Sequence, residues 1–160
     1  MGSPLLPQVV ECESACWRTL QRARTGSGFA QTSRRWTALD AESGVTTAAD
    51  DAAFWAGRAG ANRAAAESSG LTTLERTPAG RALDAEDLFS KLPYDEAVVP
   101  WENLSQRFAR EASGTVNAWV GGASPTGVWS RIEKPALMMN PNVRKIIIRD
   151  ATRPEKTRII

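Results

Sequence analysis

One amphipathic segment, residues 97–112 (AVVPWENLSQRFAREA), constrains the fold more strongly than any other part of the chain. Its apolar side chains recur at helical spacing, at Trp101, Leu104, Phe108 and Ala112. Ser105 follows Trp101 by one turn, so an indole and a hydroxyl share one side of the predicted helix. We expect the helix to begin near Pro100, whose missing N–H is tolerated in a first turn. An aromatic stripe on a helix usually packs in a core, which is the simplest interpretation of Trp101 and Phe108.

Three β-prone runs follow this helix, at residues 116–120, 127–133 and 143–148. The third contains an apolar triplet typical of a buried strand. Helices and strands joined by loops of these lengths predict an α/β (α+β) domain with a small, mostly parallel sheet flanked by helices. The second run ends at Glu133, so we expect this carboxylate at the carboxyl end of a strand, where ligands gather in open α/β sheets.

The residues before position 97 predict shorter helices and one extended segment. Helices are expected at 9–24, 61–68 and 82–91, and another from Thr46 or Thr47 to the glycines at 57 and 60. The last of these places Trp55 at a helix end, where a core position is an equally good interpretation. Glu75 lies where a short β-prone segment enters a turn, a position in which carboxylates are usually solvated or cap a helix.

Composition excludes several kinds of chemistry. The 160 residues are 42% hydrophobic and 24% charged, which fits one globular domain with a core. A net charge of +2 is too small to argue for a nucleic-acid ligand. The absence of histidine removes Ser-His and Cys-His nucleophiles and most zinc sites. No signal peptide is evident, and no apolar run approaches the roughly 18 residues that span a bilayer.

The two cysteines, Cys12 and Cys16, are predicted to be free thiols. On one regular helix their Cβ atoms would lie about 5–6 Å apart, whereas a disulfide needs about 3.8 Å. We therefore expect a protein that works in a reducing compartment and whose stability does not respond to reductant.

Four short segments stand in a suggestive order. They are FWAGR (54–58), TTLERT (72–77), PWENLSQRFAREA (100–112) and VWSRIE (128–133). This order resembles the ADP-ribosyl cyclase and NAD glycohydrolase family, whose members split nicotinamide from NAD. In that family a tryptophan with a nearby arginine comes first, then Thr-Leu-Glu-x-Thr, then a tryptophan with a serine four residues later, and last the catalytic glutamate. The resemblance covers about residues 53–148.

The resemblance implies the fold, the site and the role of each site residue. The implied catalytic residues are Glu133, Trp101, Ser105 and Glu75. The implied substrate-binding residues are Trp55, Arg58, Leu74, Thr77, Phe108 and Trp129. In this scheme the two tryptophans at 55 and 101 position nicotinamide and ribose, Glu75 lies against the nicotinamide amide, and Ser105 contacts the ribose or its phosphate. FWAGR has one more residue between tryptophan and arginine than the animal enzymes have.

The resemblance also implies a biological setting. The animal enzymes are rich in disulfides, while disulfide-poor relatives occur as toxin domains of bacterial polymorphic and contact-dependent growth inhibition systems, which this chain resembles more. That branch implies a secreted or surface-delivered toxin domain that depletes NAD in the target-cell cytoplasm, with a cognate immunity protein as partner and NAD as substrate rather than cofactor. We expect an N-terminal helix and linker at 1–44, interpreted as the remnant of an entry or translocation region, a cyclase-like domain at 45–150 and a mobile tail at 151–160.

The residue types suit this reaction. Loss of nicotinamide leaves positive charge on the ribose, as in glycoside hydrolysis, and the leaving group departs neutral. One buried carboxylate can stabilise the cation, and aromatic faces can stack on the pyridinium and exclude water. Three alternatives stay open. They are transfer of ADP-ribose to a protein, an RNase toxin with a patch at Arg107, Arg110, Arg144 and Lys145, and a binding module without catalysis.

Overall fold

The computed structural model describes residues 44–153 and 155–160. Its elements in chain order are β1 (Ala53–Ala56), α2 (Gly57–Glu67), the 3₁₀ turn η2 (Leu74–Arg76), α3 (Pro78–Ala85), α4 (Leu88–Lys91), α5 (Tyr94–Glu111), β2 (Gly114–Val120), the π-helical turn η3 (Trp129–Glu133), α6 (Lys134–Met139), β3 (Val143–Asp150) and β4 (Thr157–Ile159). The helix expected at 9–24 and both cysteines lie outside the described residues. No helix within those residues combines the length and hydropathy needed to cross a bilayer.

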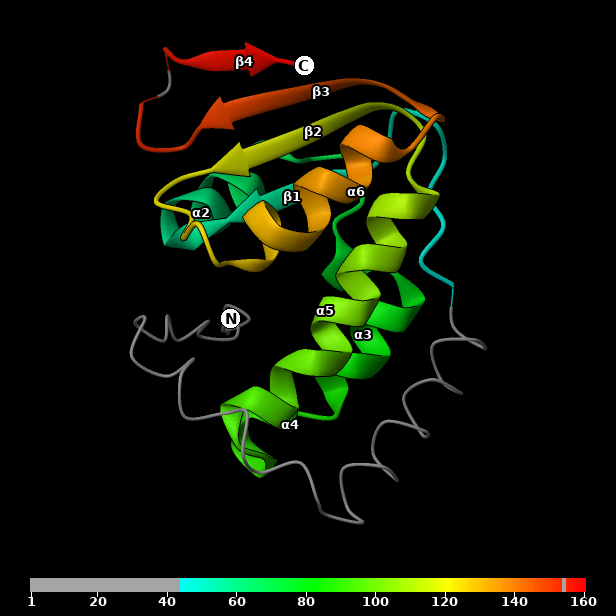
Figure 1. Ribbon diagram of the computed structural model, residues 1–160, viewed down its shortest axis with the longest axis vertical. Helices are drawn as coiled ribbons and strands as arrows, with labels where there is room; N and C mark the ends of the chain where they lie inside the picture. Colours follow the sequence, from blue (N-terminus) through cyan, green and yellow to red (C-terminus); the bar gives the residue numbers. More distant parts are fainter. Residues whose placement is uncertain (1–43, 154) are drawn as a thin grey trace.

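The four strands form one sheet in the order β1-β2-β3-β4 (Figure 1). The first three are parallel, with Trp55 opposite Trp119 and Ala118 opposite Ile148. Only β4 is antiparallel. The predicted α/β class with a small, mostly parallel sheet is therefore confirmed, as are the strands expected near 116–120 and 143–148. The tail was expected to be mobile, but its residues 157–159 pair with β3.

The sheet separates two apolar clusters. The larger one joins inward residues of the strands, such as Phe54 and Val116, to α5, η3 and α6 through Phe108, Trp129 and Leu137. The smaller one lies on the face that α2 covers and consists of Ala53, Ala64 and Trp119, with Trp55 and Leu71 packed against it. Successive strand residues point to opposite faces, so Phe54 and Trp55 belong to different sides of the sheet.

The helix expected to end at Trp55 does not exist, because Phe54 and Trp55 lie in the strand β1. The glycine that was predicted to interrupt that helix instead begins the next one. Gly57 has φ 74°, and a Cβ on it would lie 1.9 Å from the carbonyl oxygen of Gly121. Only glycine allows the chain to turn from β1 into α2 this close to the loop after β2.

The other helix boundaries also differ from those predicted. Helix α5 begins at Tyr94, after Pro93, and contains Pro100 in its interior rather than at its first turn. Asp95 and Glu96 occupy the actual first turn, where negative charge favours the helix dipole. The single helix expected at 82–91 is two helices, α3 and α4, separated by Asp87 at φ 47°.

Candidate active site

Glu133 does not end a strand, as the sequence analysis expected. It is the last residue of η3, a π-helical turn that runs directly into α6. Trp129 is buried at the start of the turn and packs on Phe54, with 6.2 Å between ring centroids. Leu137, one turn after Glu133, is fully buried. These apolar anchors hold the segment as a helix, so packing overrides its β propensity. Such π turns are rare in proteins and frequent at functional sites.

The carboxyl group of Glu133 is buried beside a hydroxyl and a second acid. Only 8% of the residue is exposed. The pKa of Glu133 is raised to about 8, mainly by burial; a hydrogen bond with the side chain of Ser105 opposes this rise, and the negative charge of Glu75 adds to it. Of the implied catalytic residues, the structure therefore brings together Glu133, Ser105 and Glu75, which come from η3, α5 and η2.

Helix α5 is the common support of this group, because it contacts both η2 and η3. Its Ser105 is buried with 6% exposure, one turn after Trp101. The Trp101 side chain is partly exposed and packs against the larger apolar cluster. An indole with one exposed side, next to the hydroxyl that binds Glu133, is well placed to meet a planar ligand.

Hydrogen bonds at Thr77 hold the turn that carries Glu75. The Thr77 hydroxyl donates to the carbonyl oxygen of Leu74 at 2.6 Å and accepts from the backbone N–H of Gly80 at 3.0 Å. It thus caps α3 and closes η2 at the same time. Leu74 is 6% exposed and belongs to the core. These two residues support Glu75, and their implied contact with substrate stays a prediction.

Helix α3 packs so closely on η2 that position 80 has room only for glycine. A Cβ on Gly80 would lie 1.9 Å from the carbonyl oxygen of Leu74 and 3.0 Å from the Cα of Glu75. We expect Gly80→Ala to displace η2 and to cost about 1–3 kcal/mol of stability, as overpacking does. Thermal melts should show a fall of several degrees relative to Gly44→Ala, because a Cβ at Gly44 would meet nothing within 4 Å. Equal melting temperatures for the two variants would contradict this role of Gly80.

The remaining implied residues fall into two groups. Phe108, with 1% exposure, stacks on Phe54 at a centroid distance of 4.8 Å, and like Trp129 it belongs to the core on the Glu133 side of the sheet. Trp55 packs in the smaller cluster on the other face, and Arg58 is exposed in the first turn of α2. The sequence analysis placed Trp55 at a helix end, but it lies on a strand. The binding roles of Trp55 and Arg58 stay predictions.

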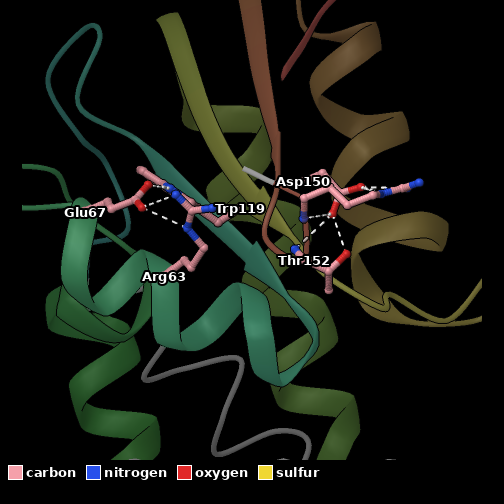
Figure 2. A network of polar contacts seen from close by, with 6 residues as sticks. Arg63, Glu67, Trp119, Asp150 and Thr152 are labelled. Atoms are coloured by element: carbon pink, nitrogen blue, oxygen red, sulfur yellow. Dashed lines mark hydrogen bonds and ion pairs between the residues drawn. The ribbon is translucent and has the colours of Figure 1, made fainter. Parts of the chain in front are cut away.

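Two polar networks secure strands β2 and β3 (Figure 2). On the α2 face, the indole N–H of the buried Trp119 donates to Glu67 at 2.7 Å, and Glu67 also pairs with Arg63. At the end of β3, hydrogen bonds from Thr152 and Arg153 hold the pKa of Asp150 well below its usual range. Glu67 and Asp150 therefore have structural roles. Glu133 differs from them, because its pKa is raised.

An ion pair beside the site was missed by sequence reasoning. The guanidinium of Arg131, in η3, pairs with the carboxylate of Glu102, in α5. The sequence analysis gave no role to either charge, because Glu102 lies away from the apolar stripe and Arg131 was expected in a strand. Their positions next to Trp101 and two residues before Glu133 are the signal that could have found them.

A shallow groove runs between α5 and α6 on the side of the molecule where Arg131 and Ile132 lie. Its lining also includes Gln106, Arg110 and Met139. Glu133, Ser105 and Glu75 do not line it, so this groove is not the candidate active site. Among the described residues, no group of three or more histidine, cysteine, aspartate or glutamate side chains is arranged to hold a metal ion.

No protein-family model and no curated protein matches the chain. Solved structures do. An ADP-ribosyl cyclase complexed with N1-cIDPR aligns over 64% of this chain and 50% of its own, with 20% identity and a TM-score of 0.50. Aplysia cyclase complexed with the substrate NGD and the product cGDPR gives the same values, with 49% of its own chain covered. Porcine CD38 with a covalent intermediate aligns over 57% of this chain and 49% of its own, at 27% identity and a TM-score of 0.48. The chain thus has the fold of the ADP-ribosyl cyclases and spans about half their length.

Proposed function

We propose that this protein cleaves the bond between nicotinamide and ribose in NAD, with Glu133 as the catalytic carboxylate. The observation that carries the proposal is the buried Glu133 beside Ser105 and Glu75, in a fold shared with cyclases that were solved with nucleotide ligands. The order of the four sequence motifs supports the same assignment. Because this chain spans about half the length of the cyclases, we attribute their activity to it only as a proposal.

The chemistry follows from the charges. When the bond between C1′ of the ribose and the ring nitrogen breaks, both electrons go to nicotinamide, which leaves neutral, and the ribose becomes a cation. The Glu133 carboxylate stabilises this cation in a site with little water, where its charge acts strongly. Water then bonds to C1′ and loses a proton to give ADP-ribose; attack by the adenine ring instead gives the cyclic product.

Substrate binding would also set the charge of Glu133. In the free protein the acid is protonated near neutral pH, since its pKa is about 8. NAD brings a positively charged pyridinium ring to the site, and an adjacent positive charge favours the carboxylate form. Trp101 would stack on this ring, and Ser105 would hold a ribose hydroxyl or phosphate oxygen. The positively charged pyridinium ring therefore favours the carboxylate form of Glu133, and this carboxylate then stabilises the cationic ribose.

The competing functions have less support. Of the four basic residues proposed for an RNA-binding patch, Arg107 pairs with Glu111 at 2.7 Å and Arg144 with Asp50 at 3.5 Å, which neutralises half of the patch. A binding module would leave Glu133 solvated, whereas it is buried. Transfer of ADP-ribose to a protein uses the same bond cleavage, and biotinylated NAD would reveal it by labelling a protein target.

The direct test is to incubate the purified protein with NAD and to follow nicotinamide by chromatography. We expect nicotinamide and either ADP-ribose or its cyclic form in equal amounts. A parallel incubation with NADP would show which dinucleotide is preferred. Release no faster than in Glu133→Gln would overturn the proposal.

The pH dependence offers a second test. Since kcat/KM reports the free enzyme and the carboxylate is the active form, kcat/KM should rise about tenfold per pH unit below the pKa of Glu133. It should level off near pH 8, because the pKa of Glu133 is about 8. Initial rates at limiting NAD, corrected for hydrolysis without enzyme, would measure it. A profile that falls with pH would contradict the assignment of Glu133 as the charged group.

We also propose that the protein acts as an NAD-depleting toxin in the cytoplasm of a target cell and is neutralised by a cognate immunity protein. The likeness of its motifs to the disulfide-poor toxin branch supports this role. Expression in bacteria should then lower cellular NAD and stop growth, and Glu133→Gln should do neither. Growth arrest with unchanged NAD would point to another activity.

A further inference from the structure

An ion pair joins the two elements that meet at Glu133. Arg131 in η3 pairs with Glu102 in α5, and the Arg131 Nε–H also donates to the carbonyl oxygen of Thr126 at 3.3 Å. The guanidinium therefore connects the loop before η3 to α5. Glu102 directly follows Trp101 on α5, and Arg131 precedes Glu133 by two residues.

This ion pair adds to the apolar contacts of the segment around Glu133. The apolar anchors of this segment, Trp129 and Leu137, lie four residues before and four residues after Glu133. The Ser130 hydroxyl donates to the carbonyl oxygen of Ser124 at 2.9 Å, which ties the turn only to the preceding loop. The pair with Glu102 ties it to α5, the helix that carries Ser105.

We propose that Glu102 and Arg131 form a positioning pair, which holds η3 against α5 so that the Glu133 carboxyl group meets Ser105. The inference rests on the proposed NAD cleavage for its kinetic consequence, but not for its structural one. Neither residue is assigned contact with the substrate; both act through Glu133. Loss of the pair would let the turn shift and admit water to the carboxyl group.

Two consequences distinguish positioning from a general contribution to stability. A half-exposed ion pair contributes at most about 1 kcal/mol, so the melting temperature should change by only about 2–4 °C. Water reaching Glu133 should lower its pKa from about 8 toward the ordinary value of 4.5, and this effect should exceed the rise caused by losing the Ser105 hydrogen bond, because burial is the largest cause of the raised pKa. The charge that acts on this carboxyl group is that of Glu75 on η2, which all of these variants leave unchanged.

The experiment uses two single variants, Glu102→Gln and Arg131→Gln, and one double variant that carries both Glu102→Arg and Arg131→Glu and so exchanges the two charges. Arg107→Gln is the matched control, because it breaks another ion pair of α5, with Glu111, that does not involve η3. At pH 9, where Glu133 is mostly ionised in every variant, we expect each single variant to lower kcat about tenfold, roughly 1.4 kcal/mol, with a smaller change in KM. The exchanged pair should recover much of this loss, and the control should behave as wild type.

A measurement without substrate separates this inference from the proposed function. Carboxyl carbon NMR of glutamate-labelled protein would follow the titration of Glu133, identified by its loss in Glu133→Gln. A lower pKa of Glu133 in Arg131→Gln, with no NAD cleavage by the wild type or by any variant, would support the positioning pair and overturn the proposed function. An unchanged pKa in Arg131→Gln overturns the positioning pair, whether or not NAD is cleaved, and so does an unchanged kcat in active protein.

Discussion

Glu133→Gln should lower the rate of nicotinamide release from NAD by at least about a thousandfold. Glutamine has the shape of glutamate and can still bond to Ser105, but it lacks the negative charge that stabilises the cationic ribose. The measurement is single-turnover cleavage of NAD at pH 8, with circular dichroism to show that the fold is kept. Glu155→Gln, which changes an exposed acid near the end of the chain, is the control and should retain full activity.

A smaller effect would count against the assignment. A variant that kept more than about a tenth of the wild-type rate would have lost only about 1.4 kcal/mol of transition-state stabilisation. That is too little for the removal of a buried charge next to a cation. In that case Glu75, the other acid of the group, would become the candidate, and Glu75→Gln should then show the larger loss.

The same Glu133→Gln variant should be more stable than the wild type, and most clearly at alkaline pH. The pKa of Glu133 is raised from 4.5 to about 8 by folding, so between these pH values the folded state binds more protons than the unfolded state. Stability from this group is complete below about pH 4.5 and is lost as pH rises through 8. Each pKa unit corresponds to about 1.4 kcal/mol, which predicts a gap of several kcal/mol between variant and wild type.

Urea denaturation at pH 5 and pH 9 would measure this gap. We expect the two proteins to differ little at pH 5 and the variant to unfold at clearly higher urea at pH 9. Parallel behaviour at both pH values would mean that Glu133 ionises as an ordinary exposed acid. A stabilising loss of function is the behaviour expected of a group that the fold keeps for chemistry rather than for stability.

The sequence predicts two strands of the sheet, β2 and β3, better than it predicts the segments around the site. The runs that became β2 and β3 are long and rich in β-branched residues, so their local preference agrees with the fold. The run at 127–133 has a similar preference, but Trp129 is buried against Phe54 and the segment folds as a helix. Packing of η3 against β1 and the rest of the core decides this, and no local pattern contains that information.

The candidate site was predictable to a similar extent. Motif order placed Glu133, Ser105 and Glu75 in one group, and the structure places their side chains close together. Their catalytic roles stay a prediction. The position of the Trp55 side chain was not predictable in this way, because the face to which it points depends on whether its segment is a helix or a strand. In β1 it points to the face of the sheet opposite to its neighbour Phe54.

The short strand β4 has a consequence for solubility. A parallel sheet that ended at β3 would expose a free edge next to Ile146, Ile147 and Ile148, and such edges recruit strands from other molecules. Ile160 exchanges backbone hydrogen bonds with Ile146, at 2.8 and 3.1 Å, and β4 pairs alongside it. Residues 157–160 thus cover the edge of β3 at which aggregation would start.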